Sequence, residues 1–182
     1  MSLPPHFKIT SGMLWLGALI LALIDVGFVP LLAWRVQRST LRRLKWTLVA
    51  TTGLFFCGLW VWALENYWDT VYSYLFPEWA RWLIPPAYGL LFAAVGLLFW
   101  WLALRSPGNP VANFCLLGGL WGIITHAWAV QRGIVSKPPL LHAVQPAAAL
   151  VVAAFEFIFY WCVILSLACV LRRGWEWRGQ RR

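Results

Sequence analysis

The chain has 182 residues, of which 62% are hydrophobic and 12% are charged, and its formal net charge is +9. Soluble domains carry about 25% charged residues, so this composition excludes an ordinary soluble domain and is typical of a membrane protein. The basic residues gather beside apolar runs, chiefly at 35–45 and 172–182, which favours a role in membrane topology over nucleic-acid binding.

Five apolar segments are long enough to cross about 30 Å of hydrocarbon at 1.5 Å per residue. They cover residues 12–34, 46–64, 84–104, 110–130 and 143–171. The sequence therefore predicts an all-α integral membrane protein, a bundle of five transmembrane helices in the single domain 1–182. The four cysteines lie within these segments and are interpreted as packing residues.

The distribution of Lys and Arg predicts the orientation of these spans. The side that holds the 35–45 loop, the 105–110 turn and the C-terminal tail carries eleven Lys and Arg, against four on the other side. Positive charge accumulates on the cytoplasmic side of membrane proteins. We therefore expect the N-terminus outside and the C-terminus in the cytoplasm, with a bacterial inner membrane as the location.

The connection between the second and third spans, ENYWDTVYSYLFPEWARWL, is unusually aromatic. Pro77 suits the first turn of a helix, where its missing N–H is not needed. We expect a short interfacial helix here, with aromatic side chains at the level of the lipid headgroups; an aromatic wall over a pocket is the alternative. The aromatic residues concerned are Trp68, Tyr72, Tyr74, Trp79 and Trp82.

Two carboxylates interrupt the apolar spans. Asp25 and Glu156 each lie about 20 Å from the outer end of their span, so we expect them at one level. Small residues recur three and seven positions before each acid, on the same face of the helix, which is typical of faces where helices approach closely, so both acids are expected to face protein. These residues are Ala22 and Ala18, and Ala153 and Ala149.

A charge at this depth costs at least about 2.5–3.5 kcal/mol, and no Lys or Arg is available there to offset it. A neutral acid is the cheaper state, and Glu156 could then form a hydrogen bond with Tyr160, four residues later. Intramembrane acids are functional candidates, so Glu156 and Asp25 are predicted catalytic or proton-carrying residues. The alternative is a neutral packing acid that fixes helix register.

A second group of polar residues is predicted near the outer face. His126 follows Gly118 and Gly122 on one stripe, so it is expected to face the bundle, while His142 opens the fifth span and Glu65 closes the second. Two histidines and a carboxylate could bind a metal or act as general acid and base. No spacing motif supports this group, so an interfacial histidine and a solvated Glu65 are the alternative.

Three classes of function remain open. The first is a membrane protein that binds a hydrophobic or amphiphilic small molecule in the bundle, with proton coupling through the acids. The second is an acid–base enzyme acting on a lipid or isoprenoid, and the third is an accessory subunit of a membrane complex or a homo-oligomer. Membrane lipid is an expected partner in each case, and the sequence indicates no cofactor. The residues expected to contact a ligand are Tyr160, Trp128, Trp121 and His142.

Overall fold

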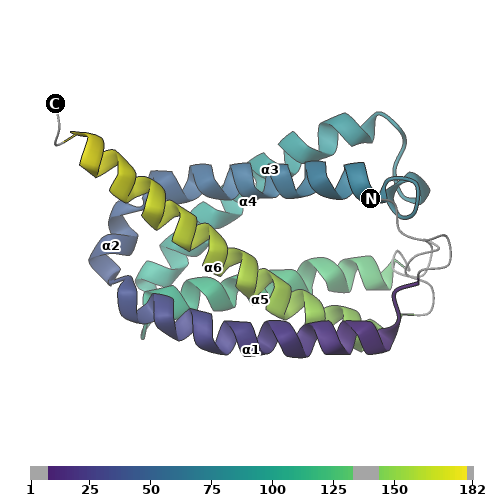
Figure 1. Ribbon diagram of the computed structural model, residues 1–182, viewed down its shortest axis with the longest axis horizontal. Coiled ribbons are helices and arrows are strands. Elements are labelled where there is room, and N and C mark those ends of the chain that lie inside the picture. The colour runs from purple at the N-terminus through teal and green to yellow at the C-terminus, as the bar shows by residue number, and fades with distance from the viewer. Residues whose placement is uncertain (1–7, 133–143, 180–182) are drawn as a thin grey trace.

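The computed structural model of the chain describes residues 8–132 and 144–179, with side chains through Arg173. Within these residues all regular structure is helical, and five helices are long and apolar enough to cross a membrane (Figure 1). The five predicted spans are therefore confirmed as helices. They are α1 (Ser11–Arg35), α3 (Lys45–Tyr67), α4 (Ala80–Arg105), α5 (Pro110–Gln131) and α6 (Pro146–Gly179).

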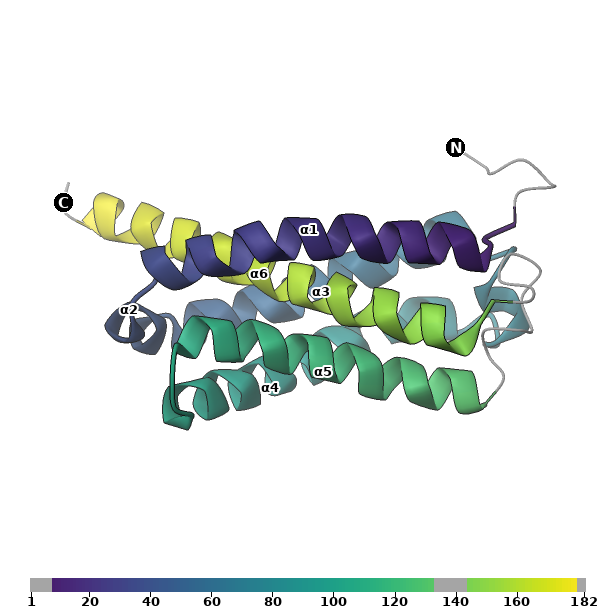
Figure 2. The same ribbon diagram turned by 90° about the horizontal axis from the view of Figure 1, so that it is seen from below.

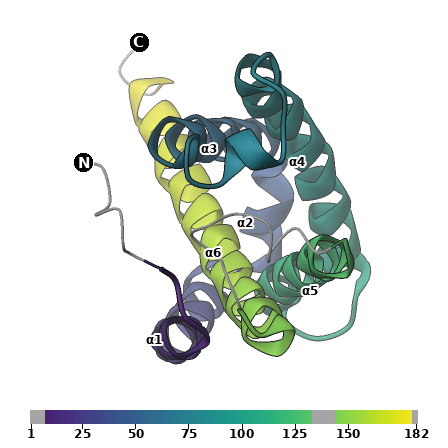
Figure 3. The ribbon, with the colours of Figure 1, turned by 90° about the vertical axis from the view of Figure 1, so that its right-hand side faces the viewer.

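The five helices lie roughly along one long axis, and α6 crosses the bundle diagonally (Figures 1 and 2). α6 packs against α1, α3 and α5, while α3 pairs closely with α4. Seen from one end, α1 and α3 lie on either side of α6 and hardly touch each other (Figure 3). In the described structure α6 therefore lies between α1 and α3.

The starts of α1 and α6 are joined. The backbone N–H of Gln145, just before α6, donates a hydrogen bond to Ser11 Oγ at 2.9 Å. Both helices thus begin at the same end of the bundle, called here the Ser11 end. The opposite end holds the α1–α3 connection and is called the Arg38 end.

The core is built from aromatic side chains and from close contact between α5 and α6. Trp161 is completely buried, with Phe99 and Phe114 each at a ring-centroid distance of 5.1 Å. On α5, Gly118 and Gly122 face α6 so closely that an added Cβ would overlap Trp161 or Phe157. The glycine stripe predicted to mark a helix contact therefore does so, because only glycine leaves room for these rings.

The basic 35–45 segment contains a helix that the sequence did not predict, α2 (Arg38–Arg43). Leu41 is completely buried and anchors α2 to the core. The Arg38 guanidinium donates hydrogen bonds to the carbonyl oxygens of Leu104, Ser106 and Gly108, at 2.7, 3.3 and 3.4 Å. Arg38 therefore joins α2 to the turn between α4 and α5, in addition to any topological role.

The interfacial helix expected to begin at Pro77 does not form there. The connection from α3 to α4 instead contains a single 3-10 turn, η1 (Tyr72–Tyr74). Pro77 lies in a turn that runs directly into α4, since the Ala80 N–H donates to the Pro77 carbonyl at 2.9 Å. The expected aromatic belt is also divided, because Trp68 is buried whereas Trp79 is 65% exposed.

Candidate functional site

Glu156 and Tyr160 lie one turn apart on α6 and form the first part of the candidate site. The Tyr160 hydroxyl donates a hydrogen bond to Glu156 Oε1, as the spacing of four residues predicted. Both side chains are half-buried. The Tyr160 ring lies 5.6 Å from Phe55 and 6.2 Å from Phe56, so this polar pair faces α3.

The connection between α3 and α4 contributes the second part of the site. The Tyr72 ring packs 5.5 Å from Trp60 of α3, and Trp60 in turn lies 4.5 Å from Tyr88 of α4. Burial, followed by the nearby Glu156 carboxylate, raises the pKa of Tyr72 from 10.0 to about 12. Glu156 is therefore within electrostatic range of Tyr72, although 84 residues of sequence separate them.

These residues form one unit at the Ser11 half of the bundle, called here the Glu156 site. It combines a carboxyl group and phenol hydroxyls with flat apolar walls. A carboxyl group can donate a hydrogen bond when neutral and can only accept one when ionised. Such a site can therefore change its hydrogen-bonding pattern with a single proton. Its members are Glu156, Tyr160, Tyr72, Trp60 and Phe55.

Asp25 lies in a different environment, between α1, α5 and α6. It is 5% exposed, so it faces protein as expected, and neither carboxylate oxygen has a hydrogen-bond partner among the described residues. Asp25 is within electrostatic range of the Cys115 thiol of α5, whose sulfur lies 3.5 Å from that of Cys162. A buried carboxyl group without a partner is rare in folded proteins and favours a functional explanation.

The expected common level of the two acids stays a prediction. Counted from the joined residues Ser11 and Gln145, Asp25 lies about 21 Å along α1 and Glu156 about 16 Å along α6 at 1.5 Å per residue. Because α6 crosses the bundle diagonally, these lengths along the helices are not depths in the bundle (Figure 1). The surroundings of the two acids do differ, since Glu156 is paired with Tyr160 whereas Asp25 has no hydrogen-bond partner among the described residues.

The expected outer group of His126, His142 and Glu65 is only partly described. His126 packs edge-on against Phe157 at 5.8 Å, and its Nδ1 lies 3.0 Å from the Gly122 carbonyl oxygen. It faces the bundle, whereas Glu65 is exposed at the end of α3. His142 lies outside the described residues, so convergence of the three stays a prediction. In the part of the chain with described side chains, no three potential metal ligands come together.

Trp121 and Trp128, two more of the residues expected to contact a ligand, pack against other partners, and His142 lies outside the described residues. Trp121 packs edge-on to Phe99 at 6.2 Å, with a buried indole N–H that has no partner in the described part of the chain. Trp128 is 57% exposed, with the Arg132 guanidinium 5.6 Å from its ring. Of the four residues expected to contact a ligand, Tyr160 alone is found beside Glu156 in the described structure.

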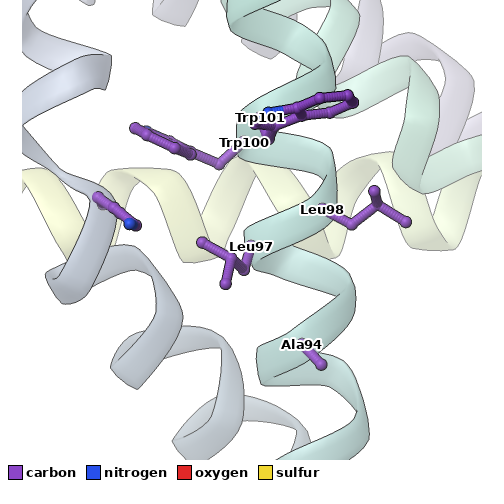
Figure 4. Close-up of a pocket in the computed structure, with 6 residues that line it drawn as sticks. Ala94, Leu97, Leu98, Trp100 and Trp101 are labelled. Atoms are coloured by element: carbon purple, nitrogen blue, oxygen red, sulfur yellow. The ribbon is translucent and has the colours of Figure 1, made fainter.

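Two cavities, each of about 390 Å³, open on the surface of the bundle. The first is an apolar hollow along α4, bordered by Leu97, Trp100 and Lys45 (Figure 4). The second lies at the Arg38 end between α1, α2 and α6 and is lined by four arginines. Neither is lined by Glu156 or Asp25. Sequence reasoning missed the second cavity because its arginines were interpreted only as a topology signal.

Comparisons with protein families, with curated proteins and with solved structures found no match for this chain. The described residues define a bundle of five apolar helices with two separate buried or half-buried acids. The chemistry of these residues is therefore the basis for the function of this protein.

Proposed function

We propose that this protein is an integral membrane protein that binds a hydrophobic or amphiphilic small molecule at the Glu156 site, and that binding is coupled to a proton on Glu156. Five helices of sufficient length and apolarity support a membrane location. The excess of Lys and Arg at the Arg38 end supports a cytoplasmic C-terminus in a bacterial inner membrane.

The single observation that carries the proposal is the Glu156–Tyr160 hydrogen bond on a half-buried face of α6. An acid with a purely structural role would be expected to be fully buried, with hydrogen bonds to all of its polar atoms. Glu156 instead lies on the helix that passes between α1 and α3, which hardly touch each other. A molecule dissolved in the membrane could therefore approach this face of α6 from the side.

The walls of the site fit an amphiphile. Trp60 and Phe55 offer flat apolar surface to the body of a ligand, while Glu156 and Tyr160 offer hydrogen bonds to a polar head. A ligand that donates a hydrogen bond or carries positive charge would stabilise ionised Glu156 and release its proton. Binding would then depend on pH through Glu156, which is the proton coupling that we propose.

The proposal can be tested on the purified full-length protein by native mass spectrometry of molecules that co-purify with it, at pH 5 and at pH 8. We expect wild-type protein to carry an amphiphile whose occupancy changes between the two pH values. Glu156→Gln keeps the shape of the side chain but cannot ionise, so occupancy should become independent of pH. Glu65→Gln, which alters an exposed acid on α3, is the matched control and should behave as wild type.

Equal occupancy in wild type and Glu156→Gln at both pH values would refute the proposed role of Glu156. Infrared titration of the carboxyl C=O stretch, compared between wild type and Glu156→Gln, gives a second readout that needs no ligand.

A subunit of a larger membrane complex is the second candidate, and one observation favours it. Neither cavity is lined by Glu156, and the space beside it is filled by aromatic rings such as Phe56 and Phe157, whose centroids are 6.0 Å apart. In that case Glu156→Gln would leave bound lipid unchanged and would instead weaken a complex seen on a native gel.

A further inference from the structure

The second cavity has a chemistry that neither the Glu156 site nor the fold explains. It lies at the Arg38 end, where the last turn of α1, the short helix α2 and the far part of α6 meet. Its volume is about 390 Å³, which is enough for a small polar headgroup. Its positive charge comes from three different helices: Arg35 of α1, Arg43 of α2, and Arg172 and Arg173 of α6.

No acid is among the residues that line this cavity. Arg35, Arg43 and Arg173 form no ion pair with any described carboxylate. Arg35, Arg43 and Arg173 come from three elements and repel one another, and no described carboxylate offsets the free-energy cost of bringing these three together. A bound anion would lower that cost.

The other lining residues indicate what kind of anion fits. Thr40 adds a hydroxyl group that can donate to oxygen atoms, while Leu32, Val36 and Leu44 form an apolar floor. Arginine binds phosphate oxygens through paired N–H groups. A polar rim of arginines and one hydroxyl over an apolar floor fits a phosphate that is attached to an apolar chain.

The surroundings of the cavity match the boundary between lipid and water. Trp34 and Trp46, on the helices that flank α2, are 73% and 70% exposed. Each lies close to a cation: the Arg35 guanidinium is 4.9 Å from the Trp34 ring, and Lys45 Nζ is 4.5 Å from the Trp46 ring. Such pairs of Trp and basic residues are typical of the headgroup level. A cavity at this level is within reach of a lipid headgroup.

We propose that this cavity binds the phosphate group of an anionic phospholipid, held by the arginines of α1, α2 and α6. Basic pockets between transmembrane helices at the cytoplasmic side are known to bind such headgroups. The site is separate from the Glu156 site and does not depend on the function proposed there. It gives α2 a role, since Arg43 and Thr40 reach the cavity only because α2 folds against the core through Leu41.

The experiment compares lipid adducts of the full-length protein by native mass spectrometry, using phosphatidylglycerol and phosphatidylcholine at equal concentration. We expect a preference for phosphatidylglycerol that falls by about fivefold for each arginine removed, in Arg43→Gln and Arg43→Gln/Arg173→Gln. Arg132→Gln removes an equal charge at the Ser11 end and is the matched control; it should keep the wild-type preference. Arg43→Lys keeps the charge and should retain most of the preference.

Two further experiments distinguish a lipid headgroup from a soluble phosphate and replace the arginine variants if these do not fold. Thermal unfolding with inorganic phosphate alone shows whether a soluble phosphate uses the site: stabilisation by phosphate that is lost in Arg43→Gln supports the site and assigns it to a soluble ligand. If the arginine variants fail to fold, Ser166→Leu fills the cavity without changing the charge and should abolish the preference. Equal binding of the two lipids by wild type, or an equal loss in Arg132→Gln, would overturn the proposal.

Discussion

Gly118→Ala should destabilise the bundle, although alanine is the better helix former. A methyl group at Gly118 would overlap the Trp161 indole at Cδ1 and lie 2.6 Å from its Cγ and Nε1. Favourable carbon contacts are about 3.5–4.0 Å, so the ring or α5 must move by at least about 1.5 Å. Trp161 is fully buried against Phe99 and Phe114, so the ring cannot turn aside and the helices must separate.

The size of the effect follows from two opposing contributions. Overpacking a core costs about 1–3 kcal/mol, and the rigid surroundings of Trp161 favour the upper end of that range. Replacing glycine with alanine in a helix interior returns about 1 kcal/mol. We therefore expect a net loss of about 2 kcal/mol for Gly118→Ala, or about 4–8 °C in the unfolding temperature of a domain this size.

Gly58→Ala provides a control of the opposite sign. Gly58 lies within α3, and a Cβ added there would meet nothing within 4 Å, so this substitution should be neutral or stabilising by up to about 1 kcal/mol. Both variants would be compared with wild type by thermal or detergent-induced unfolding of purified protein. Equal shifts for Gly118→Ala and Gly58→Ala would refute the close α5–α6 contact on which this reasoning rests.

Three further predictions concern other parts of the molecule. Arg38→Met should lower stability by about 1 kcal/mol in the same unfolding assay, because partly exposed charge-assisted hydrogen bonds to three carbonyls are lost; Arg42→Met, the control, should change little. Because the pKa of Tyr72 is raised from 10.0 to about 12, the stability that it contributes should be complete below pH 10 and lost as the pH rises from 10 to 12. Ultraviolet titration should show one fewer late-ionising tyrosine in Tyr72→Phe, and an unchanged titration would contradict the assignment. A reporter fused after Arg182 should read cytoplasmic and one inserted at Ser73 external; the reverse result would invert the proposed orientation.

The helices could be predicted because their cause is local. Long apolar runs bounded by polar residues give the five helices directly, and Asn109 followed by Pro110 marks the start of α5, where the Asn109 side chain accepts from two backbone N–H groups. α2 could not be predicted in the same way. It is six residues long and is stabilised by burial of Leu41 and by contacts of Arg38 with a turn 66 or more residues away.

The same distinction between local and long-range causes applies to the candidate site. The Glu156–Tyr160 pair follows from a spacing of four residues on one helix, so the sequence predicts it. The contribution of Tyr72 depends on how the α3–α4 connection folds back over Trp60, which no spacing reveals. The surroundings of Asp25 likewise depend on the packing of α1 against α5 and α6, which the spacing of residues along α1 does not reveal.

If the bundle spans a membrane as we propose, the length of α6 would make it responsive to the thickness of the bilayer. The stretch Pro146–Arg173 is 28 residues long, or about 42 Å, whereas the hydrocarbon of a bilayer is about 30 Å thick. The diagonal course of α6 in the bundle (Figure 1) would then take up part of this excess. A thinner bilayer would favour a steeper slant of α6 and a thicker one an upright helix. Since α6 carries Glu156 in its first half and the residues of the basic cavity in its second half, a change in the slant of α6 would move both sites at once.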